Sequence, residues 1–97
     1  MKIRHRELLD NFARKHADIQ KPLQKWINIV EESCWKSHTE LKETYPSADY
    51  VGNGRYVFNI KGNNYRIVVV IVFVGELLTV RFIGTHSEYD TIDCKTI

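Results

Sequence analysis

Apolar residues in the first part of the chain recur every three or four positions, which is the period of an amphipathic helix. The pattern predicts one helix over residues 6–16 and a second that begins near Asp18, its expected N-cap. Pro22 falls in the first turn of the second helix, where a missing N–H costs little. A short opening strand is expected over residues 2–5. The expected buried stripes are Leu8, Leu9, Phe12 and Ala13, then Leu23, Trp26, Ile27 and Val30.

A third helix is expected before the period changes. Ser37 or Thr39 is its expected cap, and Tyr45-Pro46 should end it. Beyond Pro46, β-branched and aromatic residues alternate with polar ones, as in half-buried strands. Helices followed by an antiparallel meander make an α+β fold, and a chain of 97 residues is long enough for one domain, 1–97. The three expected strands cover residues 55–61, 64–74 and 77–85.

Two short links set the predicted strand register. Gly62-Asn63 and Gly75-Glu76 each fit a two-residue hairpin, with glycine at the first position as a type II′ turn prefers. These turns would pair Asn59 with Arg66, Val69 with Phe82, and Arg66 with Thr85. The large apolar side chains then share one face, which the helices should cover. They are Tyr56, Phe58, Ile60, Tyr65, Ile67, Val69, Ile71, Phe73, Leu78, Val80 and Phe82.

The same registers place most polar strand residues on the opposite, open face. A slip of one residue would instead bury Arg66 and Arg81 without partners, at a cost of several kcal/mol each. Residues 84–90 then bring His86 and Tyr89 to the end of the sheet where Arg66 lies. The open face is expected to carry Asn59, Lys61, Asn64, Arg66, Arg81 and Thr85, interleaved with Val57, Val68, Val70 and Ile83.

Composition and charge are those of a globular protein with one basic region. Apolar residues make up 43% and charged residues 27% of the chain, and the formal net charge is only +2. From Gly52 to His86, however, Glu76 is the one acid among four Lys and Arg residues. A basic patch on one element is typical of a phosphate-binding surface, although a solvated sheet face would have a similar composition.

The chain lacks the signals of secretion, metal binding or membrane insertion. Cys34 and Cys94 have neither a metal-type spacing nor a disulfide framework around them. No apolar leader opens the sequence, and the apolar run 67–74 is far shorter than a bilayer span. We therefore expect a cytoplasmic protein with reduced thiols and no membrane partner.

The residues near His86 are those that RNA cleavage without a metal requires. Attack by a 2′-hydroxyl needs a base, an acid for the leaving 5′ oxygen, and cations at the phosphate. His86 is suited to acid or base work because the reference pKa of histidine is about 6.5. Lys61 and Arg66 can hold the phosphate, and Tyr89 can stack on a base or orient a proton network.

Each of these side chains also has a structural alternative. A histidine after a strand is often only exposed, and Tyr89 can equally close the end of the core. Asn63 and Asn64 can read a base edge or a sugar, but asparagine is first a turn former. A metal site would have to use His86, Asp90, Asp93 and Cys94, whose spacing matches no strong ligand pattern, so neither a metal nor a cofactor is expected.

Several motifs resemble the HigB family of the RelE-like toxin superfamily. Two are strings in the strand region: Arg55-Tyr-Val-Phe-Asn-Ile-Lys-Gly-Asn-Asn-Tyr-Arg-Ile-Val-Val and Arg81-Phe-Ile-Gly-Thr-His-Ser-Glu-Tyr-Asp-Thr-Ile-Asp. Three lie before them: Lys21-Pro22-Leu23 with Trp26, Trp35-Lys36, and Tyr45-Pro46-Ser47-Ala48. Together they cover nearly the whole chain in order, which makes the resemblance specific although each motif alone is weak.

The resemblance implies a RelE-like fold, with N-terminal helices on one face of a small antiparallel sheet and a catalytic surface on the other. It implies the toxin of a type II toxin–antitoxin system, an endoribonuclease that cuts mRNA in the ribosomal A site without a metal. Its implied partners are a helix-turn-helix antitoxin of the HigA type and, only through that antitoxin complex, operator DNA.

Carried over by position, the expected catalytic residues are Lys61, Arg66, Arg81, His86 and Tyr89. Asn59, Asn63, Asn64 and Arg55 are expected to contact RNA. The alternative hypothesis is a non-catalytic module that binds RNA or a protein through the same sheet face, with the valines and Ile83 as an interface patch.

Overall fold

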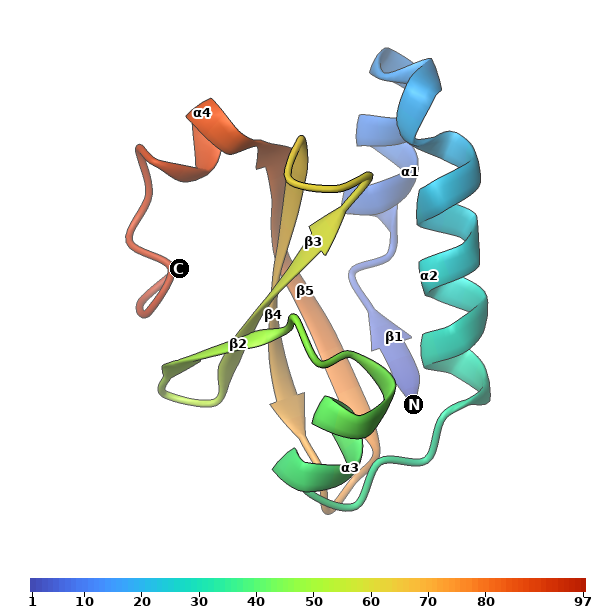
Figure 1. Ribbon diagram of the computed structural model, residues 1–97, viewed down its shortest axis with the longest axis vertical. Coiled ribbons are helices and arrows are strands. Elements are labelled where there is room, and N and C mark those ends of the chain that lie inside the picture. Colours follow the sequence, from blue (N-terminus) through green and yellow to red (C-terminus); the bar gives the residue numbers. More distant parts are fainter.

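The strands of this protein form one mixed sheet, with the two longest helices on one side of it (Figure 1). The computed structural model describes residues 1–97. The elements are β1 (Lys2–Arg4), α1 (Glu7–Lys15), the 3₁₀ turn η1 (Ala17–Ile19), α2 (Gln20–Glu32), α3 (His38–Thr44), β2 (Asp49–Gly52), β3 (Arg55–Ile60), β4 (Tyr65–Val72), β5 (Leu77–Thr85) and α4 (His86–Tyr89). No helix is long and apolar enough to cross a membrane.

The sheet has the strand order β1-β5-β4-β3-β2. The predicted meander β3-β4-β5 is present and antiparallel, and β2 adds an antiparallel edge that the alternation did not predict. At the other edge β1 runs parallel to β5, next to Leu77–Thr79 only. The sheet is therefore mixed rather than purely antiparallel, and beyond Thr79 the edge of β5 away from β4 has no strand beside it.

The three predicted helices are present within one or two residues of their expected bounds. Pro22 lies in the first turn of α2, and Ser37 caps α3 by accepting a hydrogen bond from the Glu40 N–H at 3.3 Å. The prediction that Asp18 caps α2 is wrong, because the N-cap is Ile19 and no side chain caps it. Asp18 lies in η1 and binds side chains of the sheet instead.

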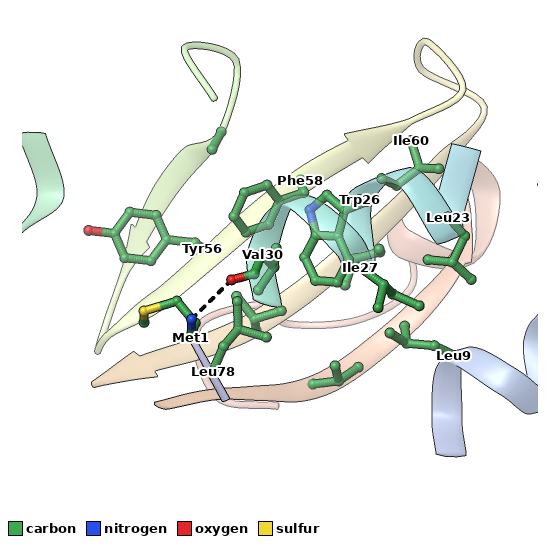
Figure 2. Packing of buried hydrophobic residues seen from close by; sticks show 14 of the residues in the cluster. Met1, Leu9, Leu23, Trp26, Ile27, Val30, Tyr56, Phe58, Ile60 and Leu78 are labelled. Atoms are coloured by element: carbon green, nitrogen blue, oxygen red, sulfur yellow. Dashed lines mark hydrogen bonds between the residues drawn. The ribbon is translucent and has the colours of Figure 1, made fainter. Parts of the chain in front are cut away.

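The face of the sheet turned toward α1 and α2, here the inner face, carries the hydrophobic core. Phe58 of β3 packs edge-on against Trp26 of α2, with ring centroids 5.3 Å apart. Figure 2 shows Leu23, Trp26, Ile27 and Val30 gathered along this face, with the Met1 amino group donating to the Val30 carbonyl at 3.0 Å. The predicted inner residues are confirmed at Tyr56, Phe58, Ile60, Tyr65, Ile67, Val69, Ile71, Leu78 and Val80, all of which are buried in this cluster.

The register of β3 with β4 is the predicted one, with Asn59 opposite Arg66. The hairpin loop contains the expected positive φ at Gly62, 65°, but Lys61 before it is also left-handed, with φ at 53°. A non-glycine residue rarely adopts this conformation. As a result Lys61 leaves the path of the strand, and its side chain does not follow the alternation that would place it with Arg66.

The predicted register of β4 with β5 is wrong, for two reasons. The turn is not confined to Gly75-Glu76: Phe73 accepts from the Glu76 N–H at 3.1 Å, and the first pair is Val72 with Leu77. A β-bulge at Arg81 then adds one residue to β5. Val69 consequently pairs with Val80, and Arg66 pairs with Gly84 rather than Thr85.

The bulge at Arg81 also exchanges the faces of the next two residues. Phe82 pairs with Val68 and so lies on the face away from the helices, here the outer face, whereas Ile83 pairs with Ile67 and packs against the core. Both had been predicted on the opposite sides. Arg81 and Phe82 thus both face outward, because Val80 before them and Ile83 after them face inward.

The outer face is not open as predicted, because the C-terminal segment, residues 90–97, lies against it (Figure 1). Val57 and Val68 on this face are only 2% and 0% exposed, yet neither belongs to the core beneath the helices. The sheet is therefore covered on both sides, by helices on the inner face and by an irregular segment on the outer face.

Candidate functional site

Arg66 lies on the outer face near the start of β4, in register between Asn59 of β3 and Gly84 of β5. Its guanidinium carbon lies 4.8 Å from the centre of the Tyr89 ring, a cation–π contact. The Nε atom of Arg66 is buried without an acceptor. Buried donors are nearly always paired in stable folds, so this nitrogen can take a partner from outside the chain.

Tyr89 projects from α4 onto this arginine, and its hydroxyl donates to Cys94 Sγ at 3.3 Å. Burial and the neighbouring Cys94 thiol raise the pKa of Tyr89 to about 12, although Arg66 acts in the opposite direction. The phenol therefore keeps its proton near neutral pH. In this environment Tyr89 is a proton donor and not a base.

His86 begins α4, and two contacts fix its position. Its N–H donates to the Asn64 carbonyl at 3.1 Å, which ties α4 to the β3–β4 hairpin. Its ring Nδ1 lies 3.3 Å from Asp90 Oδ2. The helix starts with a capping box between Thr85 and Glu88. The backbone N–H of Thr85 donates to the Glu88 carboxylate and lowers the pKa of Glu88, which keeps the cap ionised. The half-exposed ring thus has Nε2 free to exchange a proton with a ligand.

Lys61 lies apart from these residues, on the helix side of the hairpin. Its Nζ atom is 2.9 Å from Asp18 Oδ2, and the Tyr65 hydroxyl donates to the two oxygens of the same carboxylate at 2.8 and 3.0 Å. The lysine first, and then the tyrosine, lower the pKa of Asp18. The β3–β4 hairpin therefore reaches over to η1, and this ion pair occupies the lysine that the sequence suggested for the phosphate (Figure 1).

Arg55 and Arg81 meet at one acceptor in the C-terminal segment. The Ile97 carbonyl oxygen accepts from Nε and Nη2 of Arg55 at 3.3 and 3.0 Å, and from Nε of Arg81 at 3.2 Å. Asn53 Nδ2 donates to the Lys95 carbonyl at 3.2 Å. Two guanidinium groups, 26 positions apart in the sequence, thus converge on one oxygen across the outer face.

The structure groups the predicted site residues into three places. Arg66, Tyr89 and His86 lie together with Asn59 and Asn64, Arg55 lies with Arg81, and Lys61 lies with Asp18. Asn63 is exposed in the hairpin loop. None of the three grooves in the structure joins His86 to Arg66 or to Lys61. No three His, Cys, Asp or Glu side chains are grouped so as to hold a metal ion.

Sequence reasoning missed Asp18, Cys94 and the tail contacts to the two arginines. Asp18 looked like a helix cap because it precedes a proline at the usual distance, and nothing local indicates its partner 43 residues away. Cys94 and Ile97 follow the last predicted element, where no periodicity remains to be interpreted. Contacts between distant segments bring Asp18 and Ile97 to these residues, whereas Cys94 reaches Tyr89 within the same terminal region.

A basic sheet face on a small α+β domain is typical of proteins that bind RNA. Residues 19–92 match a family model, HigB toxin, described as the RelE-like toxic component of a toxin–antitoxin system. The match covers most of the chain, so the protein belongs to this family, and the α+β class expected from the sequence is confirmed.

Relatives support the same assignment. The chain is 32% identical to mRNA interferase toxin HigB of Escherichia coli (strain K12) over 85 residues, which cover 84% of this chain and 81% of the relative. It is 29% identical to mRNA interferase HigB of Escherichia coli O6:H1 over 82 residues, 82% of this chain and 80% of that protein. The family model spans every predicted site residue and ends before Cys94 and Ile97.

Proposed function

We propose that this toxin is an endoribonuclease that cleaves mRNA and thereby inhibits translation. One observation carries the proposal: in a chain related to proteins named mRNA interferases, Arg66 contacts Tyr89 on the outer face, and His86 begins the same helix as Tyr89 and is bonded through its backbone to Asn64. A cation, a protonated phenol and an imidazole are the groups that internal attack by a 2′-hydroxyl requires.

The raised pKa of Tyr89 makes it the proton donor and leaves the base role to His86. Nε2 of His86 takes the proton from the 2′-hydroxyl, whose oxygen forms a new bond to phosphorus. Tyr89, which stays protonated because its pKa is about 12, gives its proton to the 5′ oxygen as the bond from phosphorus to that oxygen breaks. Arg66 stabilises the charged phosphorane between them, through nitrogens that include the unpaired Nε.

Arg55 and Arg81 contribute a second phosphate contact next to this centre. The Ile97 carbonyl that now accepts from both guanidiniums occupies the place that a phosphate oxygen of the RNA would take. We assign Asn59 of β3 and Asn63 and Asn64 of the β3–β4 hairpin to contacts with sugars or base edges of the RNA. Lys61 reaches RNA only by leaving Asp18, so we assign it to a backbone phosphate beside the hairpin and not to the scissile one.

The partners follow from membership in a toxin–antitoxin family. We assign the site of action to the ribosomal A site in the cytoplasm, where translated mRNA is single-stranded. We further assign neutralisation to a helix-turn-helix antitoxin of the HigA type, and operator binding to the complex of the two proteins only. The family resemblance supports these assignments, and the site geometry requires neither a metal nor a cofactor for the proton transfers.

Induced expression in bacteria tests the proposal. The wild-type protein should arrest growth, and primer extension should map cuts within translated messages. His86→Ala should slow cleavage by roughly 10²–10⁴-fold, and Arg66→Ala by roughly 10²–10³-fold, because each removes one catalytic group. Lys36→Ala is the matched control, since Lys36 is exposed and pairs only with Glu76, away from the site.

The variants must be shown to fold, by circular dichroism and urea unfolding, before they are compared. Undiminished arrest in both folded variants would remove His86 and Arg66 from the site. Growth arrest without any cut message would favour the alternative, a non-catalytic module that binds RNA or protein through the same face.

A further inference from the structure

A groove beside the candidate site is lined by side chains that the proposed chemistry does not use, apart from Arg81. It lies between α1 and β5, has a volume of about 280 Å³, and is formed largely by Leu8, Phe12, Phe82 and Ile83, together with the cations Lys15 and Arg81. None of its lining residues is acidic. The groove is thus an apolar surface with positive charge at its edge.

The groove exists because β1 is short. β1 pairs with β5 only at Leu77–Thr79, so no strand covers the edge of β5 from Arg81 onward. The bulge at Arg81 then turns Phe82 to the outer face, while the next residue, Ile83, still packs on the core. Phe82 is half-buried and is not part of the core cluster, so its ring is not needed for the packing of the helices.

Phe82 also lies close to the catalytic group proposed above. Its ring covers Gly84: a Cβ placed on that glycine would meet ring atoms of Phe82 at 2.5 and 3.1 Å. Gly84 pairs directly with Arg66, and His86 follows two residues later. At about 3.3 Å per strand residue, Phe82 lies only about 7 Å along the strand from the residue opposite Arg66.

We propose that this groove binds the base of the nucleotide next to the cleaved bond, with Phe82 as its stacking platform and Arg81 and Lys15 as contacts to the flanking phosphates. The proposal rests on the proposed function. Proteins bind single-stranded RNA by combining aromatic rings with cations, because every base has a π-face and every linkage is anionic. The absence of acidic residues from this lining favours a polyanion over a basic peptide.

The test is cleavage of a reporter mRNA in a cell-free translation reaction, mapped at nucleotide resolution. Phe82→Ala should reduce the cleavage rate roughly 5- to 100-fold, the loss expected when one stacked base is released, and should alter the preference for the nucleotide beside the cut. Phe82→Trp should restore both. Lys15→Gln, an exposed change on α1 that leaves the ring in place, should weaken cleavage more at low salt than at raised salt, because salt already screens the lost phosphate contact. Tyr50→Ala, which removes a half-exposed aromatic ring on β2, is the matched control and should leave cleavage unchanged.

The outcomes separate this proposal from the proposed function. If the wild-type protein cuts no message, both fail. If the wild type cuts and folded Phe82→Ala cuts at the same rate and positions, the function holds and the groove does not bind RNA. If Phe82→Ala cuts normally but is no longer neutralised by a co-expressed antitoxin, the groove binds that protein, which also overturns the proposal.

Discussion

The two faces of the sheet are covered by different kinds of contact. On the inner face, α1 and α2 bury aromatic and aliphatic rows, with Trp26 against Phe58 at the centre. On the outer face, the C-terminal segment is held mainly by polar contacts: Arg55 and Arg81 to Ile97, Asn53 to Lys95, and Tyr89 to Cys94. The helices are therefore held on the inner face by the hydrophobic effect. The C-terminal segment is held on the outer face by side chains of a kind that also bind phosphate.

This difference separates stability from function. Apolar contacts are non-directional and grow with buried area, so the inner cover cannot be exchanged for a charged ligand. A guanidinium that donates to a main-chain oxygen can instead donate to a phosphate oxygen, which suits its fork of N–H groups. Under the proposed function, the outer cover is the one that RNA would replace, and substitutions on the two faces should have different consequences.

The largest effect is expected on the inner face. Phe58→Ala should lower the free energy of unfolding by about 3–5 kcal/mol, because it removes a fully buried ring and leaves a cavity beside Trp26. Urea unfolding followed by Trp fluorescence measures the change. Val74→Ala is the control: its side chain is 98% exposed, and its effect should stay within about 0.5 kcal/mol. Equal losses for the two would mean that the inner face is not the structural core.

Removal of the C-terminal segment is expected to lower stability by a smaller amount and to strengthen RNA binding. A chain that ends at Asp90 should lose about 2–4 kcal/mol of stability, because Val57 and Val68 become exposed, and it should still fold. Because Arg55 and Arg81 lose the Ile97 carbonyl, RNA should bind this chain more tightly than the full one. Thermal unfolding and the KM for a reporter message measure the two effects.

The full chain provides an independent check of the same point. Amide hydrogen exchange should be faster in residues 90–97 than in α2, since none of residues 90–97 is itself buried whereas α2 buries four. Loss of RNA binding on truncation, or slow exchange in the segment, would show that the outer cover is a permanent part of the site.

The inner face could be predicted from sequence, and the outer face only in part. Alternation alone placed Phe58 and Ile67 beneath the helices, because one face of a strand must be buried and the period of a strand is two. It also placed Arg66 outward. The alternation of apolar and polar residues cannot predict where a strand departs from it. The bulge at Arg81 exchanged the faces of Phe82 and Ile83. Lys61, in a left-handed conformation, turned toward Asp18.

Local conformations of this kind are set by tertiary contacts that adjacent residues do not encode. The bulge is compensated by the bond from Arg81 to Ile97, and the strained loop at Lys61 by the bond to a carboxylate 43 residues away. The parts of the site that depend on such contacts were the parts that the sequence misplaced.

The Phe82 ring packs over Gly84 of β5. Gly84→Ala should lower stability by about 1–3 kcal/mol, because a Cβ there would lie 2.5 Å from the Phe82 ring and 3.1 Å from Glu88 Oε1. Cleavage should fall with it as the ring shifts. Gly75→Ala is the matched control, since its Cβ would meet nothing within 4 Å. If both variants behave alike, the contact between Phe82 and Gly84 has no part in the site.

The smallest expected effect is a change in the pH dependence of stability when the Asp18 ion pair at the β3–β4 hairpin is removed. The bonds from Lys61 and Tyr65 lower the pKa of Asp18 in the folded protein, so its ionised form is favoured by folding. This stability is present above the unfolded pKa, about 3.9 for aspartate, and is lost as the pH falls through the lower folded value. Asp18→Asn should therefore reduce the melting temperature at pH 7 and flatten its decline below about pH 4. Asp49→Asn, on β2 and without a salt bridge, should leave the slope unchanged. Parallel melting curves for wild type and Asp18→Asn across this range would mean that the ion pair does not hold the hairpin in solution, and that Lys61 is free to contact RNA with Arg66.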